Sequence, residues 1–103
     1  MNLFEGIPTH LPKEISETLI SASGLRIERI ISKGHKSPDS WWYDQEEHEW
    51  VLLLSGAASI LFEDGTEHKL EKGDCLNIPA HTKHKVTWTD PLEVSVWLAI
   101  FYS

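Results

Sequence analysis

The sequence predicts an all-β fold of antiparallel strands, in one domain of 103 residues. Short apolar or alternating runs recur along the chain, with turn residues between them at roughly the 8–12-residue spacing of sandwiches and barrels. The dipeptide Asp64-Gly65 lies between two β-rich runs. It indicates a tight hairpin, because a type I′ turn needs positive φ at both central residues. No segment requires a helix of ordinary length.

The stretch from Glu46 to Gly56 predicts the central strand. Acidic residues lead into a short apolar run, and Gly56 ends it. The run is short for a helix and continues into another β-rich segment, which favours a strand. A second stretch, Gly73 to His84, contains a short strand that should end at Pro79, because proline lacks the N–H that a central ladder needs.

The other strands follow from alternation and turn residues. Residues 25–31 alternate apolar and charged side chains, as a half-buried strand does. Further strands are expected at 57–62, 67–70, 84–88 and 94–102. Residues 15–21 fit one helical turn or an edge strand, and the β-rich sequence that follows favours the strand. We therefore divide the chain into an N-terminal arm with this edge strand, residues 1–24, and a barrel, residues 25–103.

Composition limits the classes of partner. A net charge of −7 argues against binding nucleic acid or an anionic membrane through a basic patch. No apolar run approaches the roughly 20 residues of a membrane span. The first residues lack the cationic region and apolar run of a signal peptide, so we expect a cytoplasmic protein. The single cysteine, Cys75, allows no internal disulfide.

Five tryptophans are many for so short a chain, and we expect them to supply core and interface area. The segments Trp41-Trp42 and 97–102 are more apolar than one small barrel is expected to cover. The sequence therefore predicts a homodimer.

The stretches around Glu49 and His84 resemble the paired motifs of the cupin superfamily. The matching positions are Glu49 and Gly56 in the first motif, and Gly73, Pro79 and His84 in the second. His81 stands where the second motif has glycine. The resemblance covers roughly residues 25–102 and implies a small single-domain cupin, with an antiparallel β-barrel or jelly roll that is often dimeric.

The first motif departs from the family at the metal ligands. The usual cupin site binds a divalent metal through two histidines of an HxH pair, a glutamate and a later histidine. Here the HxH positions fall on Tyr43 and Gln45, or in the other register on Trp42 and Asp44. A divalent transition metal (Fe, Mn, Ni or Zn) would have to use Glu49 and His84 with Gln45 or His48, and Asp44 as a further option. Glutamine is a poor ligand for such metals.

Period-two alternation indicates which side chains share a pocket. Tyr43, Gln45 and Glu49 fall on one face of an extended chain, while His48 should point to the other face unless a bulge intervenes. His84, Val86 and Trp88 should point inward together. A buried imidazole needs a partner, and Glu49 could supply it without any metal.

Three functions remain open. In the first, the barrel binds a small polar molecule through Tyr43 and Gln45, with or without a weakly held divalent metal. In the second, the protein is a metal-dependent oxygenase or isomerase. In the third, His84 and Glu49 form a metal-free catalytic acid/base pair acting on a sugar-like or keto substrate.

Overall fold

The computed structural model describes residues 1–103 and contains eight strands and no helix, which confirms the predicted all-β fold. The strands are β1 (Ile15–Ala22), β2 (Leu25–Ser32), β3 (His48–Ser55), β4 (Ala57–Phe62), β5 (Glu67–Glu71), β6 (Cys75–Ile78), β7 (His84–Thr89) and β8 (Ser95–Tyr102). The strand favoured at residues 15–21 is present as β1. Without helices, the chain contains no helical membrane span.

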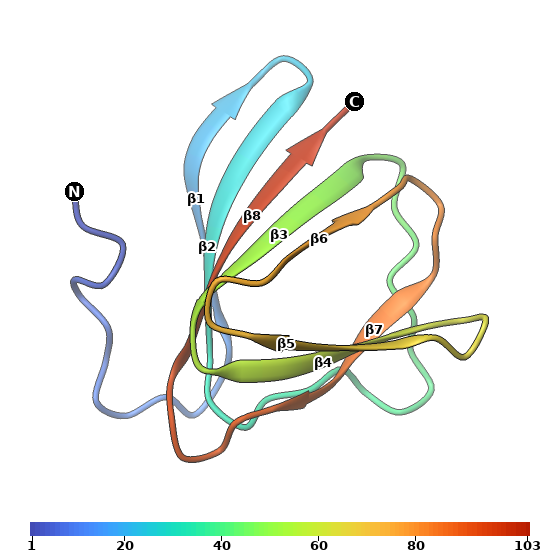
Figure 1. The fold of residues 1–103 in the computed structure, drawn as a ribbon. Helices are drawn as coiled ribbons and strands as arrows, with labels where there is room; N and C mark the ends of the chain where they lie inside the picture. The colour runs from blue at the N-terminus through green and yellow to red at the C-terminus, as the bar shows by residue number, and fades with distance from the viewer.

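Two antiparallel sheets face each other across the interior (Figure 1). The larger sheet has the order β1-β2-β8-β3-β6, and the smaller has the order β5-β4-β7. Strands adjacent in the chain, β3 and β4, therefore lie in different sheets. The chain passes from the larger sheet to the smaller one at Gly56, and the two facing sheets together form the jelly roll.

The core lies between the sheets and is built by alternation along each strand. Its buried members are Val51, Leu53, Ala58, Ile60, Leu70, Trp97, Ala99 and Phe101. Half of β8 therefore faces the barrel interior, so that part of the apolar segment 97–102 is covered by the protein itself. Trp97 is 4% exposed, whereas Trp41 is 46% exposed and contributes little to the core.

The expectation that Trp88 points inward with His84 is wrong. Trp88 is 45% exposed, while His84 is 4% exposed. Trp88 pairs with Ser59 and Val86 pairs with Ile60, so β7 has one extra residue opposite β4 at this point. A bulge of this kind reverses the alternation, and the sequence pattern carries no sign of it.

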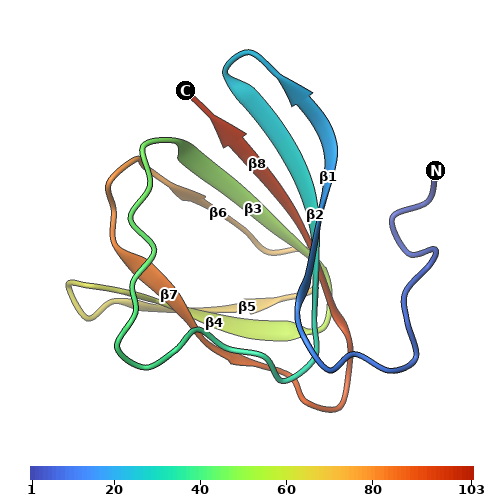
Figure 2. The same ribbon diagram turned by 180° about the vertical axis from the view of Figure 1, so that it is seen from behind.

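The N-terminal arm lies on the outer side of the larger sheet (Figure 2). Arg29 of β2 holds the arm in place. This buried guanidinium donates to the carbonyl oxygens of Leu3 and Glu5, at 3.1 and 2.7 Å, and to Glu17 Oε1 of β1 at 2.6 Å. A buried charge is tolerated only when it is paired and hydrogen-bonded. Arg29 therefore joins the arm, β1 and β2 at one point.

Candidate functional site

A cavity of about 150 Å³ lies between the two sheets. One part of its lining is apolar and includes Val51, Trp97 and Phe101, and the other part is polar. The polar lining residues are Glu14, Ser16, Glu28, Tyr43, Gln45, Glu49 and His84. A concave, largely apolar site with a few convergent polar groups is the usual form of a small-molecule site.

Glu49 and His84 reach this cavity from opposite sheets. Alternation along β3 turns Glu49 inward with Val51, and His84 is the first residue of β7, just after the turn that follows Pro79. The His84 Nε2–Glu49 Oε1 distance is 3.5 Å, and the two residues are 4% and 8% exposed. The two distant motifs therefore do meet inside the barrel.

His84 is oriented by its other nitrogen. Nδ1 lies 2.8 Å from the carbonyl oxygen of Thr82, an acceptor that requires a proton on Nδ1 and so directs Nε2 toward Glu49. Burial alone would lower the pKa of His84. The contact with Glu49, the bond to the Thr82 carbonyl and the charge of Glu49 outweigh burial and raise this pKa above its ordinary value.

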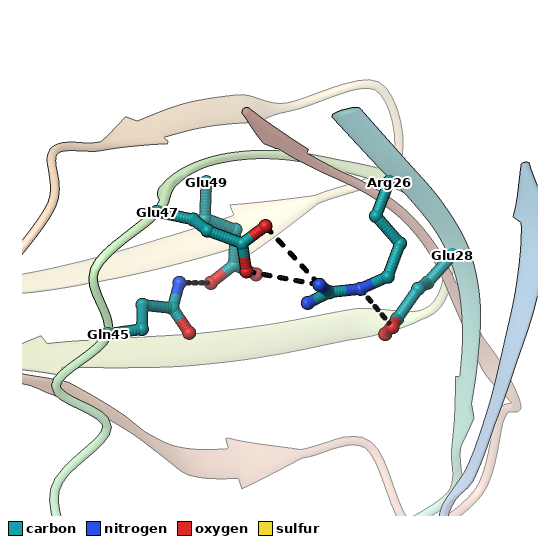
Figure 3. A network of polar contacts seen from close by, with 5 residues as sticks. All are labelled: Arg26, Glu28, Gln45, Glu47 and Glu49. Carbon is teal, nitrogen blue, oxygen red and sulfur yellow. Dashed lines mark hydrogen bonds and ion pairs between the residues drawn. The ribbon is translucent and has the colours of Figure 1, made fainter. Parts of the chain in front are cut away.

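The half-buried Gln45 completes a polar cluster with these two buried residues. Its Nε2 donates to Glu49 Oε1 at 3.0 Å (Figure 3). The loop segment that carries Gln45 is fixed by its backbone, because the carbonyl of Gln45 accepts from His81 N at 2.8 Å. We call Gln45, Glu49 and His84 the polar triad.

Tyr43 covers His84. Two backbone hydrogen bonds, Tyr43 N to His84 O at 2.8 Å and His84 N to Tyr43 O at 3.1 Å, attach the loop to β7. The two rings are stacked, with centroids 5.5 Å apart and an interplanar angle of 22°. Burial raises the pKa of the Tyr43 hydroxyl, and the charges of Glu14 and Glu49 add to this, so the phenol stays protonated as a donor.

The cavity rim contains charged residues that the sequence motifs do not indicate. Arg26 donates to Glu28 Oε2 at 2.8 Å and to Glu47 Oε1 at 3.1 Å (Figure 3). Its guanidinium carbon lies 4.2 Å from the centroid of Phe101. Glu14, at the end of the arm, accepts from Ser32 Oγ at 2.8 Å. Alternation in residues 25–31 predicts the strand, but it does not say which face is buried. In the structure the face with Glu28 and Ile30 turns to the cavity.

The other candidate ligands lie elsewhere. His48 points away from the cavity, as alternation predicts: its Nδ1 accepts from Ala80 N at 2.9 Å, and its ring lies 5.0 Å from that of Tyr102. Asp44 lies outside the cavity lining, with Oδ1 3.3 Å from Nδ1 of the exposed His81.

Cupins commonly bind divalent metals, but the residues of this cavity do not fit such an ion. No group of three or more His, Cys, Asp or Glu side chains converges anywhere in the protein. Only Glu49 and His84 meet, and the third polar neighbour is the amide of Gln45, a weak donor to transition metals. The replacement of the HxH pair therefore leaves fewer good donors than the three or four protein ligands of a usual metal site.

Comparison with known proteins agrees with this architecture. A model of the cupin domain matches residues 28–101. No curated protein matches the sequence. A structure from Ralstonia eutropha, named as a candidate mannose-6-phosphate isomerase, is 44% identical with a TM-score of 0.96, and the match covers 100% of this chain and 96% of that one.

Two more distant structures share the fold. A cupin superfamily protein from Desulfitobacterium hafniense is 21% identical over 93% of this chain and 83% of its own, with a TM-score of 0.77. A conserved Streptococcus pyogenes protein of unknown function is 20% identical over 100% of this chain and 85% of its own, with a TM-score of 0.79. The match over β2 to β8 and the two motifs around the cavity have one explanation: this protein is a member of the cupin family.

Proposed function

We propose that this cupin binds a small molecule inside its barrel without using a metal. The observation that carries the proposal is the polar triad, with Glu49 and His84 buried and Gln45 half-buried, at one end of a cavity whose remaining wall is mostly apolar. Buried polar groups are costly unless they are hydrogen-bonded, so a cluster of this kind in an open cavity favours a ligand that completes its bonds. Tyr43 and Gln45 would contact the same ligand.

The shape of the cavity limits the ligand. A cavity of about 150 Å³ in another protein, lined by apolar residues, accepts benzene. The ligand here should therefore have about six to eight non-hydrogen atoms inside the barrel, with its polar end at Glu49 and His84 and its apolar body against Trp97 and Val51.

A thermal-shift screen of small metabolites, run with and without a chelator, tests this proposal. We expect at least one compound to raise the Tm to the same extent in both conditions. Glu49→Gln should remove the shift, and Glu93→Gln, at an exposed loop position, should retain it. A shift that occurs only after Fe, Mn, Ni or Zn is added would instead support the metal-dependent alternatives.

A metal-free isomerase is the second candidate. The observation in its favour is that the Thr82 carbonyl fixes Nδ1 of His84, which leaves Nε2 oriented at the cavity beside Glu49. An oriented imidazole with a raised pKa is suited to moving a proton on a keto or sugar-like substrate. The activity should survive chelation and be lost in Glu49→Gln.

The name of the Ralstonia eutropha structure points to a sugar phosphate, and the cavity argues against that substrate here. Its lining includes three carboxylates and no Lys or Arg. Phosphate recognition normally uses cationic side chains or a helix N-terminus, and the chain has no helix. A neutral substrate fits the lining better than a phosphorylated one.

The proposal includes a homodimer, formed through the outer face of the larger sheet. Ile27, Ile100 and Trp50 lie side by side across β2, β8 and β3, on the face opposite the cavity, and each is only partly buried. The open face of an antiparallel sheet is usually polar. An apolar row of this kind favours a second copy as its cover.

A further inference from the structure

The cavity described above has an acidic lining, and this charge bears on the class of ligand. Glu14, Glu28 and Glu49 all line it, and the one lining residue that can be cationic is His84. Arg26 neutralises Glu28 at the rim, where their atoms are 2.8 Å apart. Glu14 has only the hydroxyl of Ser32 as a partner. The cavity therefore carries net negative charge, which lowers the free energy of a bound cation and raises that of an anion.

Glu49 has an acceptor atom that the protein does not use. Both of its contacts, with Gln45 Nε2 and with His84 Nε2, are made by Oε1. Oε2 forms no hydrogen bond or ion pair within the protein. No fully buried side-chain oxygen lacks a partner, so this atom is open to the cavity rather than sealed in the core. An oxygen of a buried carboxylate gains most from a charged N–H donor, since such bonds are about twice as strong as neutral ones.

The aromatic walls are also suited to a cation. Tyr43, Trp97 and Phe101 line the same cavity, and aromatic faces attract ammonium and guanidinium groups. The protein shows this recognition once already at the rim. There the guanidinium of Arg26 is held between two carboxylates and lies 4.2 Å from the centre of Phe101.

We propose that the cavity selects a small organic ammonium ion with an apolar body, bound through an N–H donated to Glu49 Oε2. This inference rests on the proposed function, because it names the ligand class of the same site. It accounts for three features together: the acidic lining, the free oxygen of a buried carboxylate, and the aromatic wall.

Three probes of similar size and shape separate charge from fit: benzylamine, benzyl alcohol and benzoate. Isothermal titration at neutral pH in moderate salt should give benzylamine an affinity about tenfold above that of benzyl alcohol. Both probes can donate a hydrogen bond to Glu49, but only the ammonium group adds attraction between opposite charges. Benzoate should not bind measurably.

Variants then locate the effect. Glu49→Gln keeps the size of the side chain, and it should remove most of the advantage of benzylamine over benzyl alcohol, because it weakens the charged probe much more than the neutral one. Glu14→Gln, at the exposed mouth, should lower the affinity for benzylamine about threefold, because it removes a charge that acts at long range. This variant tests the effect of charge even if Glu49→Gln is poorly folded. Glu93→Gln should change nothing.

The outcomes are distinguishable. If benzyl alcohol or benzoate binds as tightly as benzylamine, the inference about charge is overturned and the proposed small-molecule site stands. If none of the three probes binds and no metabolite raises the Tm in the screen, the ammonium inference and the proposed small-molecule function are both overturned.

Discussion

Glu49 Oε1 and His84 Nε2 lie 3.5 Å apart, although one residue comes from β3 of the larger sheet and the other from β7 of the smaller. They are the two family ligands that this chain retains, and they face each other directly. With Gln45 on the same carboxylate oxygen, the pair forms a polar contact at the position where cupins commonly bind a metal.

Removal of the Glu49 carboxylate should lower the pKa of His84. Burial disfavours the imidazolium, and in the wild-type protein the contact with Glu49 outweighs that effect. In Glu49→Gln the amide carries no charge, so burial should dominate and bring the pKa of His84 below that of the wild-type protein. NMR titration of the imidazole nitrogens measures this directly. An unchanged pKa would mean that the pair is not coupled.

The same pair should make stability depend on pH. The folded-state pKa of His84 is raised, so the folded protein holds this proton more tightly than the unfolded chain does. The resulting stabilisation is fully present below the ordinary value of 6.5 and is lost as pH rises through the folded-state pKa. The groups facing the imidazole are Glu49, Tyr43 and, across the cavity, Glu14 and Glu28.

Urea unfolding of the wild-type protein and of His84→Gln across this range tests the effect. The difference in unfolding free energy between them should shrink as pH rises from about 6 to 8.5. This range includes the ordinary pKa of histidine and a raised pKa above it. A difference that stays constant would show that His84 does not change its proton affinity on folding.

Gly56 should tolerate no side chain. Its φ is +81°, and an added Cβ would lie 2.6 Å from Ser95 Cα and also clash with Ser95 Oγ. Gly65, with φ +92° and nothing within 4 Å, provides a matched control for the backbone conformation alone. We expect Gly65→Ala to cost about 1 kcal/mol of unfolding free energy and Gly56→Ala clearly more, about 3 kcal/mol. Equal losses would mean that β8 moves aside without cost.

The sequence predicted the fold well because short strands, turn residues and motif glycines are local signals. Gly56 illustrates this: the motif identified it, and the close approach of Ser95 explains why glycine is needed there. The motif resemblance identified Glu49 and His84, and period-two alternation added Tyr43 and Gln45; all four line the cavity.

The parts that the sequence did not predict depend on tertiary geometry. The bulge opposite Ser59 turned Trp88 outward, and only strand pairing reveals a bulge. The face of β2 that contains Glu28 and Ile30 lies against the cavity, and Arg26 on the same face pairs with Glu47, 21 residues away in the chain. The periodicity of a single strand cannot predict a contact between residues so far apart in the sequence.

Arg29 should be important for the stability of the N-terminal arm. Its guanidinium binds Leu3 O, Glu5 O and Glu17 Oε1, and the residue is 4% exposed. Arg29→Ala would leave these acceptors unpaired and should lower the unfolding free energy by about 2–3 kcal/mol. Lys72→Ala, at an exposed turn, should have little effect.

Hydrogen exchange locates the change. Amides of residues 1–14 should exchange faster in Arg29→Ala, while those of β3 and β8 keep their relative protection. If exchange rises uniformly across the barrel, Arg29 stabilises the whole fold and the arm is not held by it in particular.

The apolar row of Ile27, Ile100 and Trp50 should mediate dimerisation. A carboxylate placed in a desolvated apolar contact is costly, so Ile100→Glu should weaken self-association about a hundredfold or more. Sedimentation velocity over a range of protein concentrations measures this, with Glu93→Gln as the control at an exposed loop. The Ile100 side chain faces away from the cavity, because its neighbours Ala99 and Phe101 belong to the core, so ligand binding should be retained in the monomer. If Ile100→Glu sediments as the wild-type protein does at every concentration, this face is not the contact between copies.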